Sequence, residues 1–317
     1  MEPLWDRRLV MVTGKGGVGK TTLTAALAQS AVAAGRRVLA AEVSSDASAQ
    51  SPLMQRLGHP EVRSTVPVDL GNGLFGVRLV PSAGHRIFLQ EALRVRLLVD
   101  AAMRSSALNR FLMAAPAFPE VGTLYQLVSL LRDPAYDHIL VDLPATGHAL
   151  GLASLPRVVL KVVPSGMVAR AIQEGLDAMT DPDQGRAILV TLPEAMPVSE
   201  TMELQKGLAG HGVEVRALVL NRIPPDPFTP EERDALDAHL QQRDHPLLGS
   251  REFRRLDRAR TARQRFEEEG PPHTQRLYVP DLSESVPDER AVVESVRKHL
   301  DNHFVTEQPA QASEEAL

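Results

Sequence analysis

Short runs of apolar and β-branched residues recur along the chain, and segments with helical spacing lie between most of them. Several runs are apolar nearly throughout, as expected for strands that are covered on both faces of a sheet. The runs that predict strands are Leu9–Thr13, Arg37–Val43, Leu74–Val80, His138–Asp142, Val158–Val163, Ala187–Leu192, Ala217–Asn221 and Leu277–Val279. This alternation predicts an α/β fold with a doubly wound, mainly parallel sheet and helices on both sides.

Two helical excursions interrupt this alternation, at about residues 84–132 and 224–272. The first holds helical pieces at Arg86–Met103 and Val121–Leu131, and the second opens with Thr229 as a predicted N-cap and Pro230 at the first helical position. We expect both to be insertions in one domain over residues 1–302, and we expect the acidic tail at 303–317 to be disordered.

Composition narrows the function classes. The chain of 317 residues has no cysteine, which excludes disulfides, thiolate metal sites and cysteine nucleophiles. It shows no signal peptide at its start and no apolar stretch long enough to span a membrane, so we expect a cytoplasmic protein whose membrane role would need a partner. The net charge of −5 argues against nucleic acid as a partner.

A glycine-rich loop follows the first predicted strand and opens the first predicted helix, Thr22–Ala34. It reads Gly14-Lys15-Gly16-Gly17-Val18-Gly19-Lys20-Thr21-Thr22 and satisfies the P-loop pattern G-x-x-x-x-G-K-[ST]. Backbone N–H groups of such a loop point inward at phosphate oxygens, and the helix N-terminus adds positive potential. We expect Lys20 to reach the β- and γ-phosphates of ATP, Thr21 to ligate Mg²⁺ and Thr22 to help hold the α-phosphate.

A second motif, Asp142-Leu143-Pro144-Ala145-Thr146-Gly147-His148, follows the predicted strand at His138–Asp142. An aspartate at the carboxyl end of a parallel strand stands beside the P-loop in such sheets, where it can hold Mg²⁺, usually through water. Gly147 permits backbone rearrangement in a switch loop. The alternative for Asp142 is a turn or helix cap.

The extra lysine of the loop, Lys15, gives the sequence a resemblance to the deviant Walker A class of P-loop ATPases. That class includes the arsenite-pump ATPases, the tail-anchored-protein targeting ATPases, the Min and Par positioning ATPases and the nitrogenase iron protein. The resemblance implies a homodimer in which Lys15 reaches the partner's nucleotide and stabilises the charge of phosphoryl transfer. The alternative is a solvated surface lysine.

Further segments resemble the soluble bacterial ArsA-like ATPases of the arsenite-pump and tail-anchored-targeting type, namely the switch at Asp142, residues 189–201 and residues 219–222. The resemblance implies that Asn221 contacts the adenine and that Pro280 lies in the loop flanking the base. A strand-end cap is the alternative for Asn221. No Asn-Lys-x-Asp guanine signature is present, which favours ATP over GTP.

The sequence departs from that family at the first switch, where Ser44 stands at the position of the catalytic aspartate. Serine is a poor base, and Glu42 and Asp46 are the nearby carboxylates that could replace it. We therefore expect hydrolysis that is slow or needs a partner, with a structural role for Glu42 as the alternative. The cysteines of the arsenite site and of the targeting ATPases' zinc site are missing.

Two surfaces carry open alternatives. The excursion at 84–132 offers either a client-binding groove or plain core, through the residues Leu89, Leu93, Leu97, Leu98, Met103, Leu108, Phe111, Leu112 and Met113. The arginine-rich segment Arg251–Arg265 offers either a solvated helix or a surface for an anionic partner.

The function that we expect is that of a Mg·ATP-hydrolysing, nucleotide-gated homodimer that drives or signals to an unknown protein client or membrane partner. A nucleotide-dependent switch or scaffold with little turnover, and a Par-like positioning ATPase, are the alternatives.

Overall fold

The computed structural model describes residues 3–46, 49–93, 118–162, 164–242, 248–282 and 288–305. An eight-stranded sheet runs through the described chain in the order β3-β4-β2-β5-β1-β6-β7-β8. Its strands are β1 (Leu9–Gly14), β2 (Val38–Val43), β3 (Val68–Gly71), β4 (Leu74–Leu79), β5 (His138–Asp142), β6 (Gly185–Thr191), β7 (Val215–Ile223) and β8 (Gln275–Pro280). All neighbouring pairs are parallel except the edge pair β3–β4, so the prediction of a doubly wound, mainly parallel α/β sheet is confirmed.

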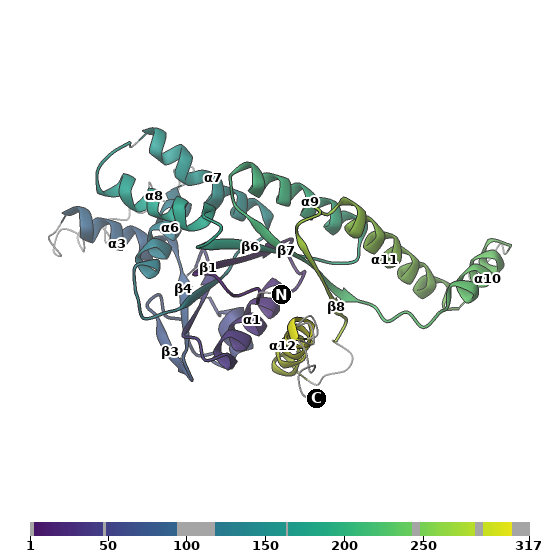
Figure 1. Cartoon of the computed structure of the whole chain (residues 1–317). Coiled ribbons are helices and arrows are strands. Elements are labelled where there is room, and N and C mark those ends of the chain that lie inside the picture. The colour runs from purple at the N-terminus through teal and green to yellow at the C-terminus, as the bar shows by residue number, and fades with distance from the viewer. Residues whose placement is uncertain are drawn as a thin grey trace, which may run out of the picture.

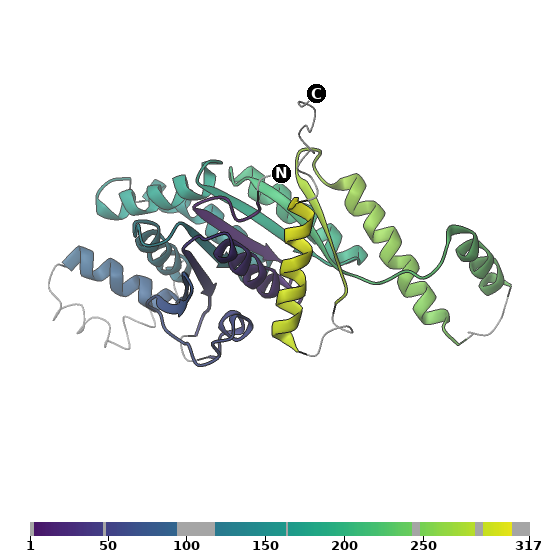
Figure 2. The ribbon, with the colours of Figure 1, turned by 60° about the horizontal axis from the view of Figure 1, so that its bottom comes forward.

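Helices cover both faces of the sheet (Figures 1 and 2). One face carries α1 (Lys20–Ala33), α2 (Pro52–Leu57) and α12 (Glu289–Val305). The other carries α3 (Pro81–Leu93), α6 (Phe118–Leu131), α7 (Thr146–Val162), α8 (Met167–Thr180), α9 (Ala195–Gly210) and α11 (Ser250–Glu269). The short helix α10 (Pro230–Gln241) lies far from the sheet at the end of the arm that it forms with α11 (Figure 1).

Side-chain alternation along the strands builds the two cores. In β1, Leu9 and Met11 pack into the core on the side of α6–α9, whereas Val10 and Val12 pack into the core under α1 and α12. All six residues of β1 are buried. A strand that is apolar on both faces is therefore read correctly from the sequence as a central strand.

Two features differ from the strand prediction. The segment Val158–Val163 is not a strand, because its described part up to Val162 belongs to α7. The valine run favours a strand locally, but Val158 is 56% exposed on the helix surface, and packing of the rest of α7 decides the structure. The sequence prediction missed β3, a four-residue edge strand that pairs antiparallel with β4 across the turn at Asn72.

The second excursion begins as predicted. Thr229 is the N-cap of α10, and its hydroxyl accepts a hydrogen bond from the N–H of Glu232, whose carboxylate in turn accepts one from the N–H of Thr229. In the first excursion, α3 and α6 pack against each other. Residues 94–117, with most of the apolar positions expected there, lie outside the described residues. Helix α12 continues to Val305, and residues 306–317 of the predicted tail also lie outside them.

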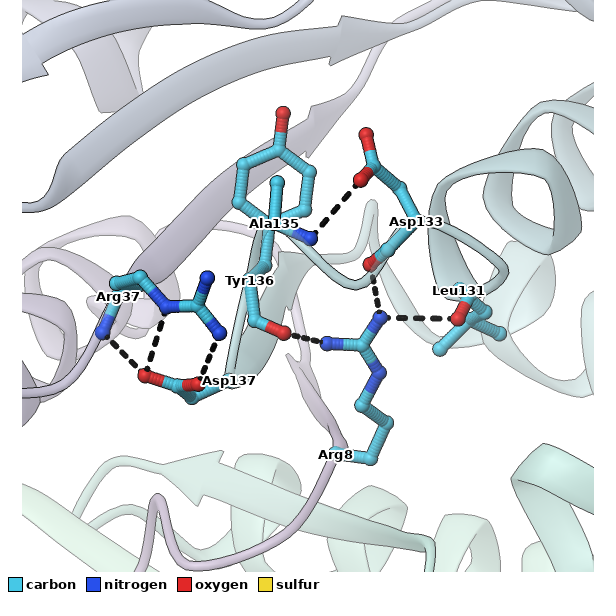
Figure 3. Close-up of polar contacts among 7 residues, drawn as sticks. All are labelled: Arg8, Arg37, Leu131, Asp133, Ala135, Tyr136 and Asp137. Atoms are coloured by element: carbon cyan, nitrogen blue, oxygen red, sulfur yellow. Dashed lines mark hydrogen bonds and ion pairs between the residues drawn. The ribbon is translucent and has the colours of Figure 1, made fainter.

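Polar contacts anchor the amino-terminal end of the central strand β5 (Figure 3). Asp137 accepts hydrogen bonds from the N–H, Nε and Nη2 of Arg37, at 2.8, 3.3 and 2.6 Å. Arg8 donates to the carbonyl oxygens of Leu131 (2.9 Å), Asp133 (2.6 Å) and Tyr136. The hydrogen bonds from Arg37 hold the pKa of Asp137 at about 2. These contacts tie the start of β5 to its neighbours β1 and β2, and thereby fix its register.

Candidate functional site

The glycine-rich loop connects β1 to α1 at the carboxyl edge of the sheet, as the sequence predicts. Gly16 and Gly17 are exposed at its tip, whereas Val18 is fully buried and anchors it. Gly19 is the N-cap of α1 and has a φ of 98°, a left-handed conformation that favours glycine. A Cβ at Gly19 would lie 2.3 Å from Nδ2 of Asn221, so a larger residue would clash there as well.

The two polar residues that open α1 face the end of β5. Thr21 donates a hydrogen bond from Oγ1 to Oδ2 of Asp142, at 2.7 Å. Lys20 donates from Nζ to the carbonyl oxygen of Lys15, at 2.9 Å, so its ammonium lies across the mouth of the loop. Burial lowers the pKa of Lys20, and the charge of Asp142 acts against that shift. The structure thus brings together three of the predicted residues from two separate motifs.

Asp142 is buried beside a second carboxylate. The register of β5 sets it next to Val12 of β1 and Glu42 of β2. Burial raises the pKa of Asp142 to about 6, the Thr21 hydrogen bond lowers it, and Glu42 raises it further. Its Oδ1 atom is buried and has no hydrogen-bond partner among the described residues. An unpartnered carboxylate oxygen next to a threonine hydroxyl is a donor set that suits a hard divalent cation such as Mg²⁺.

A small cavity of about 160 Å³ lies beside the loop, on the side of α12. Asn221, at the end of β7, and Pro280, at the end of β8, both line it, as does Thr22. Asn221 also donates from Nδ2 to the carbonyl oxygen of Val18, at 2.8 Å. The two residues expected to flank a base therefore line the same cavity, and Asn221 is also tied to the loop.

Lys15 forms an ion pair within its own chain. Its Nζ lies 2.7 Å from Oε1 of Glu200 on α9, and 3.8 Å from Sδ of Met196. Both partners of the ion pair are more than a third exposed, so solvent screens it. Lys15 is therefore a surface cation in contact with an acidic side chain, near the tip of the loop.

Ser44 follows β2 and is held by a buried arginine. Arg78 of β4 donates from Nη2 to Oγ of Ser44, at 2.6 Å, and to the carbonyl oxygen of Asp46, at 2.7 Å. The Ser44 hydroxyl also donates to that same carbonyl, at 3.0 Å. Ser44 lines a cavity of about 310 Å³ together with Pro144 of the second switch. It therefore lies on the side of the second switch, as expected for a residue of the first switch.

Glu42 has a structural role. It is 7% exposed, and its Oε2 accepts hydrogen bonds from the hydroxyl of Ser51, at 2.5 Å, and from the N–H of Leu53, at 2.8 Å. These groups form the N-terminus of α2, which a carboxylate stabilises. A carboxylate that accepts these hydrogen bonds is poorly placed to act as a general base. The contacts therefore favour the structural alternative for Glu42, and its catalytic role stays a prediction.

Several contacting residues were not predicted from the sequence. Arg56 on α2 donates from Nε to the Thr22 hydroxyl, at 3.0 Å, and lines the cavity beside Asn221. Glu200 and Arg78 were also missed. A lone arginine within the apolar run Leu74–Val80 was a usable signal for Arg78, whereas no motif marks Arg56. The side chains of Thr146 and His148 in the second switch lie outside the described residues.

A parallel sheet with this loop at the end of its first strand, and with an aspartate from a neighbouring strand on the loop threonine, defines a P-loop nucleoside triphosphatase. The sequence profile of the family described as anion-transporting ATPase (ArsA ATPase) matches residues 7–173 and 167–244. The chain belongs to this family and is an ATP-binding, ATP-hydrolysing enzyme.

Individual relatives agree with this assignment. The chain is 31% identical to the ATPase BagA of Mycobacterium tuberculosis over 232 residues, which cover 71% of this chain and 68% of that protein. It is 26% identical to an arsenical pump-driving ATPase of Escherichia coli over 258 residues, and 27% identical to that of Acidiphilium multivorum over 261 residues. Each of those two matches covers 75% of this chain but only 43% of the relative. In the described part of the chain, no helix is both long and apolar enough to cross a membrane.

Proposed function

We propose that this ATPase binds Mg·ATP between the loop at residues 14–22 and a second copy of the chain, and that the resulting dimer drives or signals to a partner. The observation that carries the proposal is the contact between Thr21 and Asp142, since it joins the two motifs that would hold the metal and the γ-phosphate. The backbone N–H groups of Gly14, Gly16, Gly17, Val18 and Gly19 would bind phosphate oxygens.

The proposed roles of the remaining site residues follow their positions. Thr21 and Asp142 would hold Mg²⁺, which supplies charge neutralisation between the phosphates. Lys20 would exchange its contact with the Lys15 carbonyl for phosphate oxygens. Asn221 and Pro280 would contact the adenine in the small cavity, where Arg56 and Thr22 form the neighbouring wall.

Lys15 would complete the site of the second subunit. Because its ion pair with Glu200 is partly exposed and held by flexible side chains, Lys15 is free to exchange partners at small energetic cost. An additional cation near the transferred phosphoryl group stabilises the charge of the transition state.

The test measures dimerisation and nucleotide retention together. Sedimentation of the purified chain with Mg·ATP, Mg·ADP or EDTA should show a dimer with Mg·ATP alone. Lys20→Ala should lose nucleotide retention, whereas Lys15→Ala should retain nucleotide as a monomer. If Lys15→Ala dimerised like the wild type, the shared site would be wrong even though nucleotide binding stood.

A second candidate, a nucleotide-dependent switch with little turnover, is favoured by the surroundings of Ser44. Its hydroxyl is already engaged by Arg78 and by the Asp46 carbonyl, and it is a weak base. Steady-state hydrolysis by the wild type, compared with Lys20→Ala, separates the two functions. The cytoplasmic location expected from the sequence stays a prediction.

A further inference from the structure

A groove of about 720 Å³ adjoins the small cavity, with which it shares Arg222 and Asp281. It is bounded by the segment that leads from β6 into α9, by the end of β7 and by α11, which packs against α9 (Figure 1). We call it the arginine groove because four arginines line it, namely Arg222, Arg255, Arg258 and Arg265. No step of ATP binding or hydrolysis described above uses it.

The four guanidinium groups differ in their partners. Arg255 and Arg265 form ion pairs along α11 with Glu252 and Glu269, each at 2.8 Å. Arg258 instead donates from Nε to the carbonyl oxygen of Arg254, at 3.2 Å, and makes no ion pair within the described part of the chain.

Arg222 is the second guanidinium group that makes no ion pair with the described residues. Its Nη1 lies 3.5 Å from the carbonyl oxygen of Gly17. With Arg258, it can therefore accept an incoming carboxylate without breaking an internal salt bridge.

The walls of the groove are apolar as well as cationic. Leu192, Pro193 and Ala195 line it on one side, and Ala259 and Ala262 of α11 line it on the other. Met196 stands at the same wall with 68% of its surface exposed. A small phosphate compound would need no such surface, whereas a peptide side chain packs well on an exposed, flexible methionine.

The charge balance also separates the possible occupants. Two carboxylates, Glu194 and Asp281, line the groove with the four arginines, and Glu252 and Glu269 offset Arg255 and Arg265, so the local charges balance. Only Arg222 and Arg258 offer the groove a guanidinium group outside an ion pair with the described residues. Carboxylates in the wall and a net charge of −5 disfavour a nucleic acid backbone. We infer that the arginine groove binds an acidic, amphipathic peptide segment of a partner protein, with its carboxylates on Arg222 and Arg258 and its apolar face on Met196.

The position of the groove gives this binding a consequence for the nucleotide. Arg222 lines both the arginine groove and the small cavity beside Asn221, and it also contacts the Gly17 carbonyl of the loop. Met196 contacts Lys15. A peptide held by Arg222 and Met196 therefore contacts two residues that each touch the loop, and this couples its affinity to that of the nucleotide. This coupling rests on the proposed nucleotide-gated function, whereas the peptide site itself does not.

The direct test is fluorescence anisotropy with the full-length protein and a labelled probe. The probe is a designed helical peptide of about 16 residues, with glutamates on one face and leucines on the other. Its matched control carries lysine in place of every glutamate. The protein should bind the acidic probe, and salt should weaken the binding, whereas the basic control should not bind.

Helix α11 offers a matched pair of variants. Arg258→Glu reverses a charge in the groove and should weaken probe binding by about tenfold, since the partner carboxylates then face a like charge. Arg260→Glu makes the same change at an exposed position that does not line the groove, and it should leave binding within about twofold. Met196→Ser should also weaken binding, and Mg·ATP should change the affinity of the wild type by about fivefold or more.

Four results would overturn the inference. Equal losses in Arg258→Glu and Arg260→Glu would mean that surface charge alone attracts the probe. Equal binding of a probe without the leucines would mean that the groove does not recognise an amphipathic peptide. Loss of binding on addition of inorganic triphosphate at equal charge concentration would assign the groove to phosphate compounds. Loss of Mg·ATP-dependent dimerisation in Arg258→Glu without any effect on the probe would assign it to a contact between copies. Normal nucleotide retention by Arg258→Glu would show in each case that the proposed function survives.

Discussion

Gly84 of α3 and Gly122 of α6 touch backbone to backbone: a Cβ added to Gly84 would lie 1.6 Å from the carbonyl oxygen of Gly122. The two helices therefore cross at their glycines. This contact holds the described beginning of the first excursion in place.

Gly84→Ala should consequently destabilise the protein. The methyl group has no room beside the Gly122 carbonyl, so the helices must separate, and we expect a loss of about 1–3 kcal/mol in the free energy of unfolding. Gly210→Ala is the control, because a Cβ at Gly210 of α9 meets no atom within 4 Å. Denaturant unfolding of the two variants measures the difference, and equal stabilities would contradict the close crossing.

Asp142→Asn should stabilise the protein while impairing its function. Burial raises the pKa of Asp142 from 3.8 to about 6. Above that pH the carboxylate is charged in both states, but only the folded state buries this charge, which is unfavourable. The asparagine removes this cost, and we expect a gain of about 2 kcal/mol at pH 8 without nucleotide.

The sign of the pH dependence follows from the raised pKa. The advantage of Asp142→Asn should be present above about pH 6 and should vanish below about pH 4, where the carboxyl group is protonated in both states. Thermal unfolding across this range checks it. An advantage that persists unchanged at pH 4 would exclude the buried charge as its cause. Magnesium-dependent hydrolysis by the variant should fall at every pH.

Asp137→Asn should have the opposite effect on stability. The hydrogen bonds from Arg37 hold the pKa of Asp137 at about 2, below its ordinary value, so the folded state gains stability from the carboxylate above about pH 4. That gain is lost as the pH falls toward 2. The variant should therefore unfold at lower denaturant concentration at pH 7 and should match the wild type near pH 2. An equal deficit at both pH values would mean that the ion pair is not responsible.

Ser44→Asp should increase the rate of ATP hydrolysis. An aspartate at this position supplies a carboxylate, which is a better base toward the attacking water than the serine hydroxyl. We therefore expect an increase in kcat of about tenfold or more at unchanged KM. Ser45→Asp places the same charge one residue further along and should have little effect. Phosphate release at saturating Mg·ATP measures both. No increase in Ser44→Asp would mean that Arg78 holds the new carboxylate away from the reaction.

Glu200→Gln should favour the dimer. Without the carboxylate, Lys15 keeps no ionic partner among the described residues, and it should move to the second subunit at a lower ATP concentration, by about threefold. The stability of the monomer should hardly change. Sedimentation over a series of ATP concentrations tests this, and a higher ATP requirement in Glu200→Gln would show that Glu200 orients Lys15 instead of withholding it.

Much of the fold could be predicted because its central strands are apolar on both faces and alternate with helices. The P-loop was predictable for a stronger reason, since its glycines, Lys20 and Thr21 follow a sequence motif of fixed spacing. The failures have a common origin in tertiary structure. The valines at 158–162 belong to a helix because α7 packs as a whole, and β3 exists because β4 offers it an edge.

The site was predictable only where its residues follow motifs. Asp142, the last residue of β5, and Asn221, near the end of β7, were expected at the site and lie beside the loop, whereas Arg56, Arg78 and Glu200 reach it from elements far along the chain. Their positions depend on how α2, β4 and α9 are placed in three dimensions. A structural role for Glu42 was the alternative that the sequence left open, but its partners Ser51 and Leu53 at the start of α2 could be found only in the structure.

The anchoring of β5 by Arg8 and Arg37 has a mechanical consequence. Hydrogen bonds from Arg8 and Arg37 hold one end of this strand to its neighbours (Figure 3), and the other end presents Asp142 to Thr21. We therefore expect β5 to keep its position in the sheet. Rearrangements that accompany a turnover should then take place in the loops that follow Asp142. The protein can therefore change the shape of the surface at the carboxyl ends of the strands while the sheet keeps its structure.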